Sequence, residues 1–265
     1  MADADAVRDA GLPVRLTPTP EPEAPAPPPA ASPAAAEMSL VDHLTELRNR
    51  LVKVVVAIAV ASTVGFYFGD QIVAILRAPI PGDQPLYYTG LGDAFGIRLK
   101  ISIVVGIILA MPVILYQGWA FVAPGLTDSE RRMARPWIPL ALIFFALGVG
   151  IAYFVLPFAA SFLLGFSSPD LQPLITASNY FDFVTTMFLA FGLVMEFPIL
   201  LFGLSRVGIV TSERLRRARR MAILVIAVFA AAITPGTDVV SPIVLGLTMY
   251  LLFEGTVFFI ARSGK

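Results

Sequence analysis

A single carboxylate interrupts an otherwise apolar run, "FLAFGLVMEFPILLF", residues 188–202. Glu196 lies near its middle, where a charged carboxylate in a membrane costs at least about 2.5–3.5 kcal/mol. We therefore expect this side chain to face protein or water, or to carry a proton. Pro198 cannot donate a backbone hydrogen bond, so it predicts a kink beside a polar pocket. The alternative is a protonated Glu196 that is hydrogen-bonded inside a helix bundle.

A second acid, Glu254, lies in another apolar run, "MYLLFEGTVFF", residues 249–259. Like Glu196, it has no Lys or Arg inside an apolar segment as an obvious partner. Both acids are therefore candidates for a functional contact within the membrane.

The segment "MSLVDHLTELRNRL", residues 38–51, combines apolar and charged residues at helical spacing. Its leucines recur every three or four residues, while Asp42, Glu46 and Arg50 follow one another at i, i+4. The pattern predicts an amphipathic helix at the membrane surface that continues into a membrane span. Its charged face is either a solvated anchor or a recognition surface.

Another mixed segment, "YQGWAFVAPGLTDSERR", covers residues 116–132. Trp119 and Phe121 are typical of the headgroup level of a bilayer. Thr127 and Glu130 form a T-x-x-E capping box that predicts the start of a helix. Glu130 either only caps that helix or also accepts a cation with its second oxygen.

The arginine-rich segment "TSERLRRARR", residues 211–220, begins with helix-capping chemistry. Most of its charge fits the excess of Lys and Arg on the cytoplasmic side of membrane proteins. A specific binding role for these arginines is the alternative.

The composition places most of the chain in lipid. Hydrophobic residues make up 57% and charged residues 14%, and the mean hydropathy is +0.80; soluble domains are about one-quarter charged. The formal net charge is zero, which gives no reason to expect nucleic acid as a partner. The chain has no cysteine and one histidine, His43, so we expect no disulfide, thiolate metal site or multi-histidine metal site, and no cofactor.

Six apolar segments must position these residues, and they predict an all-α integral membrane protein. A helix needs about 20 residues to cross a bilayer, whereas the fifth segment has only about 13 and spans about 20 Å. The six segments are Leu51–Phe68, Phe95–Tyr116, Pro136–Leu156, Phe183–Leu204, Met221–Ile233 and Val239–Ile260. They form one predicted domain, residues 38–262, between a disordered Pro/Ala-rich tail, residues 1–37, and a short end, residues 263–265.

The distribution of Lys and Arg predicts the orientation. The other side of the membrane is expected to hold only three basic residues, Arg77, Arg98 and Lys100. Both chain ends are therefore expected in the cytoplasm. The basic residues predicted to be cytoplasmic are Arg48, Arg50, Lys53, Arg131, Arg132, Arg135, Arg206, Arg214, Arg216, Arg217, Arg219, Arg220, Arg262 and Lys265.

Five motifs in register carry a family resemblance. They are "HLTELRNRL", "PVILYQGWAFVAPGLTDSERR", "FGLVMEFPILLFGLSRVGIVTSERLRRARR", "TPGTDVVSP" and "MYLLFE". Across residues 38–262 the chain resembles TatC, the multispanning receptor subunit of the twin-arginine protein translocase. The resemblance implies six transmembrane helices in a cupped bundle in the cytoplasmic membrane of a prokaryote.

The resemblance also implies what several residues do. Glu46, Arg48, Phe121 and Glu130 match positions that bind the twin-arginine motif in the signal peptide of a folded cargo protein. The chemistry is suitable, because a carboxylate accepts a planar guanidinium with bidentate geometry. Pro79 matches a residue linked to translocation.

Three acids match regions associated with translocation or partner contact: Glu196, Asp238 and Glu254. The implied partners are single-span subunits of the TatA and TatB type, further TatC copies and the lipid bilayer, and transport is driven by the proton-motive force. We expect a receptor and assembly platform without catalytic residues. A proton- or ion-coupled transporter of a small solute is the alternative, whereas an intramembrane protease lacks a plausible catalytic dyad.

Overall fold

The computed structural model describes residues 40–81, 85–125, 127, 131–132, 136–168, 170, 172–206, 208, 210–235 and 238–262. In this part of the chain, nearly all regular structure is helical, and an isolated parallel bridge joins Tyr87 to Thr176. The predicted all-α class is confirmed, while residues 1–37 and 263–265 lie outside the described residues. The elements are α1 (Leu40–Tyr67), α2 (Gly69–Arg77), α3 (Asp93–Val122), η2 (Ala123–Gly125), α5 (Trp137–Leu164), α6 (Ala177–Val194), α7 (Phe197–Arg206), α8 (Ser212–Arg217), α9 (Arg219–Ile233) and α10 (Val240–Arg262).

Five helical stretches in the described chain are long and apolar enough to cross a membrane. They are Val41–Tyr67, Asp93–Gly125, Trp137–Leu164, Ala177–Ser205 and Val240–Arg262. The segment predicted to be the short fifth span forms α9, which has 15 residues and a length of about 22 Å. The six-span count and the cytoplasmic position of both chain ends stay predictions.

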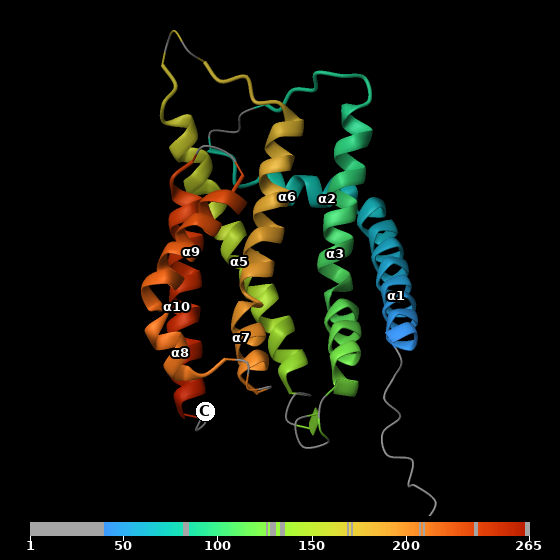
Figure 1. Ribbon diagram of the computed structural model, residues 1–265. Helices are drawn as coiled ribbons and strands as arrows, with labels where there is room; N and C mark the ends of the chain where they lie inside the picture. Colours follow the sequence, from blue (N-terminus) through green and yellow to red (C-terminus); the bar gives the residue numbers. More distant parts are fainter. Residues whose placement is uncertain are drawn as a thin grey trace, which may run out of the picture.

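The helices stand side by side in an open row (Figure 1). Helix α1 packs along α3, α3 contacts α5 and α6, and α10 packs against α5, α7 and α9. The start of α1, the end of α3 and the end of α10 lie at the bottom of Figure 1, here called the lower end. The connections from α2 to α3 and from α5 to α6 lie at the opposite, upper end. An open row is consistent with the cupped bundle that the resemblance implied.

Small residues bring α1 and α3 close together. A Cβ atom added at Gly106 would lie 2.1 Å from Oγ of Ser62 and 2.7 Å from its backbone nitrogen. At Gly65, such an atom would lie 3.0 Å from the carbonyl oxygen of Ser102. Small residues at a helix interface allow backbones to approach in a membrane. Elsewhere α1 is exposed, since only 6% of its most apolar stretch is buried inside the protein.

The core of the protein is built around α6, eleven of whose 18 residues are buried. Phe191, Met187 and Val184 on α6 are fully buried. Helix α5 crosses α6 at very short range, because a Cβ atom at Gly148 would lie 2.4 Å from the carbonyl oxygen of Phe191. Residues of α9 and α10 complete this apolar cluster.

The chain breaks its helix at Met195 and Glu196, between α6 and α7. Here the amide of Glu196 donates to the carbonyl oxygen of Leu193 at 3.1 Å, which is a tighter turn than an α-helix. Pro198 lies two residues further and cannot donate the next helical bond. The helix is therefore interrupted where the kink was predicted. The polar pocket predicted beside it stays a prediction.

The third apolar segment was predicted to end at Leu156, before Pro157, and this boundary is wrong. Helix α5 continues through Pro157 to Leu164. A proline inside a helix costs about 3 kcal/mol, but Leu156 and Ala159, on either side of it, are fully buried in the core. Tertiary packing therefore maintains the helix across the proline.

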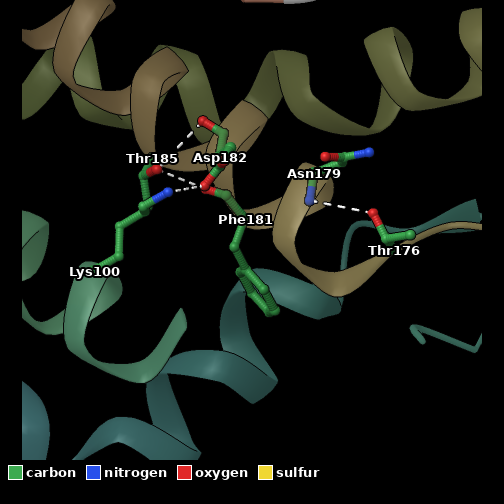
Figure 2. A network of polar contacts seen from close by, with 6 residues as sticks. All are labelled: Lys100, Thr176, Asn179, Phe181, Asp182 and Thr185. Atoms are coloured by element: carbon green, nitrogen blue, oxygen red, sulfur yellow. Dashed lines mark hydrogen bonds and ion pairs between the residues drawn. The ribbon is translucent and has the colours of Figure 1, made fainter. Parts of the chain in front are cut away.

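Polar contacts join the two parts of the row near the upper end. Figure 2 shows Lys100 of α3 in an ion pair with Asp182 of α6, and Thr185 donating to the carbonyl oxygen of Phe181 at 2.6 Å. In the same view Thr176 accepts from the amide of Asn179 and caps the start of α6.

Candidate functional site

The lower ends of α1 and α3 bring together residues that are far apart in the sequence. His43, Glu46 and Arg50 are spaced three and four residues apart, so they share one face of α1. The ring of His43 stacks on Phe121 of α3, with ring centroids 4.4 Å apart and planes inclined by 21°. This face of α1 therefore meets the last turn of α3. We call these residues, together with Gln117, the lower-end cluster.

An ion pair stands at the centre of the lower-end cluster. Arg50 donates from Nε to Oε1 of Glu46 at 2.9 Å, and Nη2 reaches the same oxygen. A third nitrogen, Nη1, lies 3.4 Å from Oε1 of Gln117 on α3. The side chains of Glu46 and Arg50 are each 22% exposed. The cluster thus holds a partly desolvated carboxylate that already binds a guanidinium.

Arg48, also predicted to belong to the signal-peptide site, is not brought into the cluster. It is exposed, and its Nη2 lies 3.3 Å from Oδ1 of the neighbouring Asn49. Glu130, the other predicted arginine acceptor, lies outside the described residues. Beside that segment, the guanidinium of Arg131 lies 5.9 Å from the ring centroid of Trp119, within the range of a cation–π contact.

Glu196 is far from this cluster, at the break between α6 and α7. The residue is only 7% exposed. Its Oε1 is buried and has no hydrogen-bond partner among the described residues. A buried, unpaired polar atom costs about 1–3 kcal/mol. Such an atom in the middle of an apolar span marks a candidate contact site for a polar group of another molecule.

Asp238 has a structural contact at the start of α10. Its Oδ1 accepts from the backbone amide of Ser241 at 2.6 Å, which satisfies one of the free N–H groups of the first turn. The residue is buried, and its Oδ2 has no partner among the described residues. This contact explains why an aspartate precedes α10, and it uses only one of the two carboxylate oxygens.

Glu254 has a partner that the sequence did not indicate. Its Oε2 accepts from Nη2 of Arg219 at 2.6 Å. Arg219 lies outside the predicted apolar segments, and it reaches Glu254 because α9 runs antiparallel to α10 and brings its first residue alongside. The pair joins the start of α9 to α10.

Pro79 lies two residues after the end of α2, a helix in the upper half of Figure 1, whereas the lower-end cluster lies on α1 and α3. It is half-buried, and the next residue, Ile80, is buried in the core. The amide of Ile80 donates to the carbonyl oxygen of Arg77 at 3.0 Å and closes a turn. Pro79 therefore contributes to the shape of the upper side and not to the cluster.

Sequence reasoning missed two members of the lower-end cluster. His43 was not assigned to the site, although its spacing of three residues from Glu46 puts both on one helix face. Gln117 lies one turn before Phe121 and could have been found in the same way. The pairing of α1 with α3 was needed to show that these two faces meet. Among the described residues, no group of three or more His, Cys, Asp and Glu could hold a metal ion.

Comparisons with known proteins agree with one another. The family model described as "TatC: Sec-independent protein translocase protein" matches residues 42–247. A protein of that name from Carboxydothermus hydrogenoformans is 37% identical over 223 residues, which cover 83% of this chain and 92% of the relative. One from Aquifex aeolicus is 37% identical over 227 residues, 83% of this chain and 94% of the relative. A crystal structure described as "Twin Arginine Translocase Receptor- TatC in DDM" superposes with a TM-score of 0.73 at 36% identity, and the match covers 82% of this chain and 99% of that one.

Proposed function

Because the chain belongs to the TatC family of Sec-independent protein translocase proteins, we propose that its lower-end cluster is a receptor site for the paired arginines of a signal peptide. The family consists of multispanning membrane proteins that are translocase components rather than enzymes. On this proposal the lower end faces the cytoplasm, where a folded cargo protein arrives. Transport of that cargo uses the proton-motive force.

The observation that carries the proposal is the contact between Glu46 and Arg50. Two nitrogens of one guanidinium already converge on the Glu46 carboxylate. The pair is partly exposed, so a guanidinium from outside can reach it. Phe121 lies beside this site and offers an aromatic surface. Glu130 supplies the second acceptor in the proposal, on the strength of the sequence motif alone.

The remaining acids form the proposed contacts with other subunits. Glu196 has an unpartnered carboxylate oxygen inside an apolar span, which supports a role in binding polar groups of single-span TatA- or TatB-type partners. Asp238 and Glu254 each have one oxygen in a protein contact and one without a partner among the described residues. Pro79 contributes to translocation on the opposite side, and further TatC copies are proposed partners of the protein.

The receptor proposal is tested by binding a labelled signal peptide to the protein in nanodiscs. Peptides with Arg-Arg and with Lys-Lys are compared on the wild type, Glu46→Gln and Glu130→Gln. We expect the wild type to prefer Arg-Arg about tenfold or more, because a lost charge-assisted hydrogen bond is worth about 1.5–3 kcal/mol, and each variant to lose most of that preference.

Glu213→Gln is the matched control for this experiment. Glu213 is exposed and forms an i, i+4 ion pair with Arg217 on α8, so the variant removes an acid of the same kind away from the cluster. It is expected to bind both peptides as the wild type does. A wild type that binds the two peptides equally would overturn the receptor proposal.

A further inference from the structure

We infer that Arg50 is an internal competitor, which occupies the Glu46 carboxylate until an arginine of the signal peptide replaces it. The inference rests on the proposed function and concerns the regulation of the same site. In the free protein, Arg50 is then the group that an incoming peptide has to displace. Arg50 itself belongs to this chain, so its effect on the affinity can be measured by substitution.

The geometry of the pair supports exchange. Arg50 presents Nε and Nη2 to one oxygen of Glu46. A bidentate guanidinium uses both carboxylate oxygens, so a peptide arginine can form a fuller contact than Arg50 does. Among the described residues, its side chain bonds α3 through Nη1, which lies 3.4 Å from Oε1 of Gln117. This distance is long for a hydrogen bond. Arg50 is therefore held mainly by Glu46, on its own helix.

The partial burial of Glu46 explains why it needs a partner while no peptide is bound. A carboxylate that is largely removed from water is costly when it is left unpaired. Glu46 is only 22% exposed, and Arg50 keeps it paired while no peptide is bound. Exchange replaces one guanidinium by another, so the carboxylate stays paired, and the released Arg50 side chain can turn to water.

A competitor inside the protein has a defined effect on binding. It lowers the apparent affinity by the same factor for every ligand that must displace it. The ratio between the Arg-Arg and Lys-Lys affinities is therefore independent of Arg50. Partly exposed ion pairs at i, i+4 are weak. We therefore expect Arg50 to lower the apparent peptide affinity by about two- to fivefold.

The test measures peptide binding to the full-length Arg50→Gln protein in nanodiscs. We expect both the Arg-Arg and the Lys-Lys peptide to bind about two- to fivefold more tightly than to the wild type, with their ratio unchanged. Lys53→Gln controls for the loss of one positive charge on the same helix. Arg217→Gln controls for the loss of an i, i+4 ion pair elsewhere. Both controls are expected to bind as the wild type does.

Three outcomes would overturn the inference. Weaker binding of both peptides by Arg50→Gln would mean that Arg50 orients α1 against α3. A changed ratio would mean that Arg50 contacts the peptide itself. Equal tightening by Lys53→Gln would mean that net charge alone is responsible. If Arg50→Gln does not fold, Arg50→Lys retains the charge without the fork, and the same three outcomes apply with a smaller expected tightening.

The design separates this inference from the proposed function. Both the receptor proposal and the inference about Arg50 are overturned if the wild type shows no preference for Arg-Arg and Glu46→Gln binds the peptides as the wild type does. A wild type that prefers Arg-Arg and depends on Glu46, combined with an Arg50→Gln variant that does not bind more tightly, leaves the receptor function in place. In that case Arg50 is not a competitor.

Discussion

The pair of helices α1 and α3 and the core around α6 use the same residue type in opposite surroundings. On α1, which is almost entirely exposed outside its contact with α3, Glu46 is partly accessible and paired with Arg50. In the core, Glu196 is buried, and one of its oxygens has no partner among the described residues. The helix that carries a carboxylate thus decides whether that carboxylate is accessible from water or enclosed in an apolar core.

The largest expected effect is a loss of stability when a methyl group is added in the core, where the helices are closest. In Gly148→Ala, the new Cβ would meet the carbonyl oxygen of Phe191 at 2.4 Å and Cα of Gly192 at 2.9 Å. Both are backbone atoms, so α5 and α6 must move apart, at an expected cost of about 1–3 kcal/mol in the free energy of unfolding. A lower thermal midpoint in detergent would show this.

Gly150→Ala is the control for that prediction. The position lies on the same helix, and a Cβ there meets nothing within 4 Å. The variant should unfold at or slightly above the wild-type temperature, because alanine favours a helix by about 1 kcal/mol over glycine. Equal destabilisation by the two substitutions would contradict the close crossing of α5 and α6.

Glu196→Ala tests the role of the buried acid in the core. If Glu196 contacts partner subunits, the loss of a hydrogen bond to a carboxylate should weaken partner crosslinking and transport about tenfold. The protein should stay folded, because removal of a buried oxygen that has no partner offsets part of the packing lost with the side chain. Unchanged crosslinking and transport would exclude the partner role, and Glu213→Ala serves as the control on an exposed acid.

Gly106→Ala is the corresponding test at the contact between α1 and α3, here called the seam. A Cβ there would approach the backbone nitrogen and Oγ of Ser62 within 3 Å. Helix α1 can move outward because little else holds it, so we expect a loss of stability of about 1 kcal/mol, at the low end of overpacking costs. Peptide binding should fall more clearly, since Glu46 would move relative to Phe121.

For the seam, Gly96→Ala is the control, since a Cβ there meets nothing within 4 Å. It should leave both stability and peptide binding unchanged. If Gly106→Ala instead destabilises the protein as strongly as Gly148→Ala while peptide binding survives, then α1 is not the loosely attached helix described above.

The smallest expected effect concerns the ion pair between α9 and α10. Glu254→Gln removes the charge that binds Arg219 at 2.6 Å. Since both side chains are partly exposed, the change in the free energy of unfolding should stay below about 1 kcal/mol and shrink further at high salt. A larger, salt-independent loss would mean that this pair is essential to the packing of α9 against α10.

The sequence predicted the membrane helices well, because hydropathy and length are local properties. It also predicted the break near Pro198, since proline chemistry acts within one turn. It did not predict the continuation of α5 through Pro157, which depends on packing against α6. The partner of Glu254 was missed for a related reason, because only the antiparallel packing of α9 and α10 brings Arg219 alongside.

The candidate site was predictable in part. The spacing of Glu46 and Arg50 indicated an i, i+4 contact, and the ion pair is present. The stacking of His43 on Phe121 could not be derived, because it depends on how far α1 slides along α3. That register is set by Ser62 and Gly106, whose contact is not visible in hydropathy.

A double-mutant cycle between protein and peptide tests most directly the claim that Glu46 binds a signal-peptide arginine. It combines wild type and Glu46→Gln with peptides that carry Arg-Arg, Lys-Arg or Arg-Lys in nanodiscs. For one of the two lysine peptides, we predict a coupling energy of about 1.5 kcal/mol or more with Glu46→Gln, as expected of groups in direct contact. Additive losses for both lysine peptides would show that Glu46 contacts neither arginine and would contradict the receptor site at the lower end.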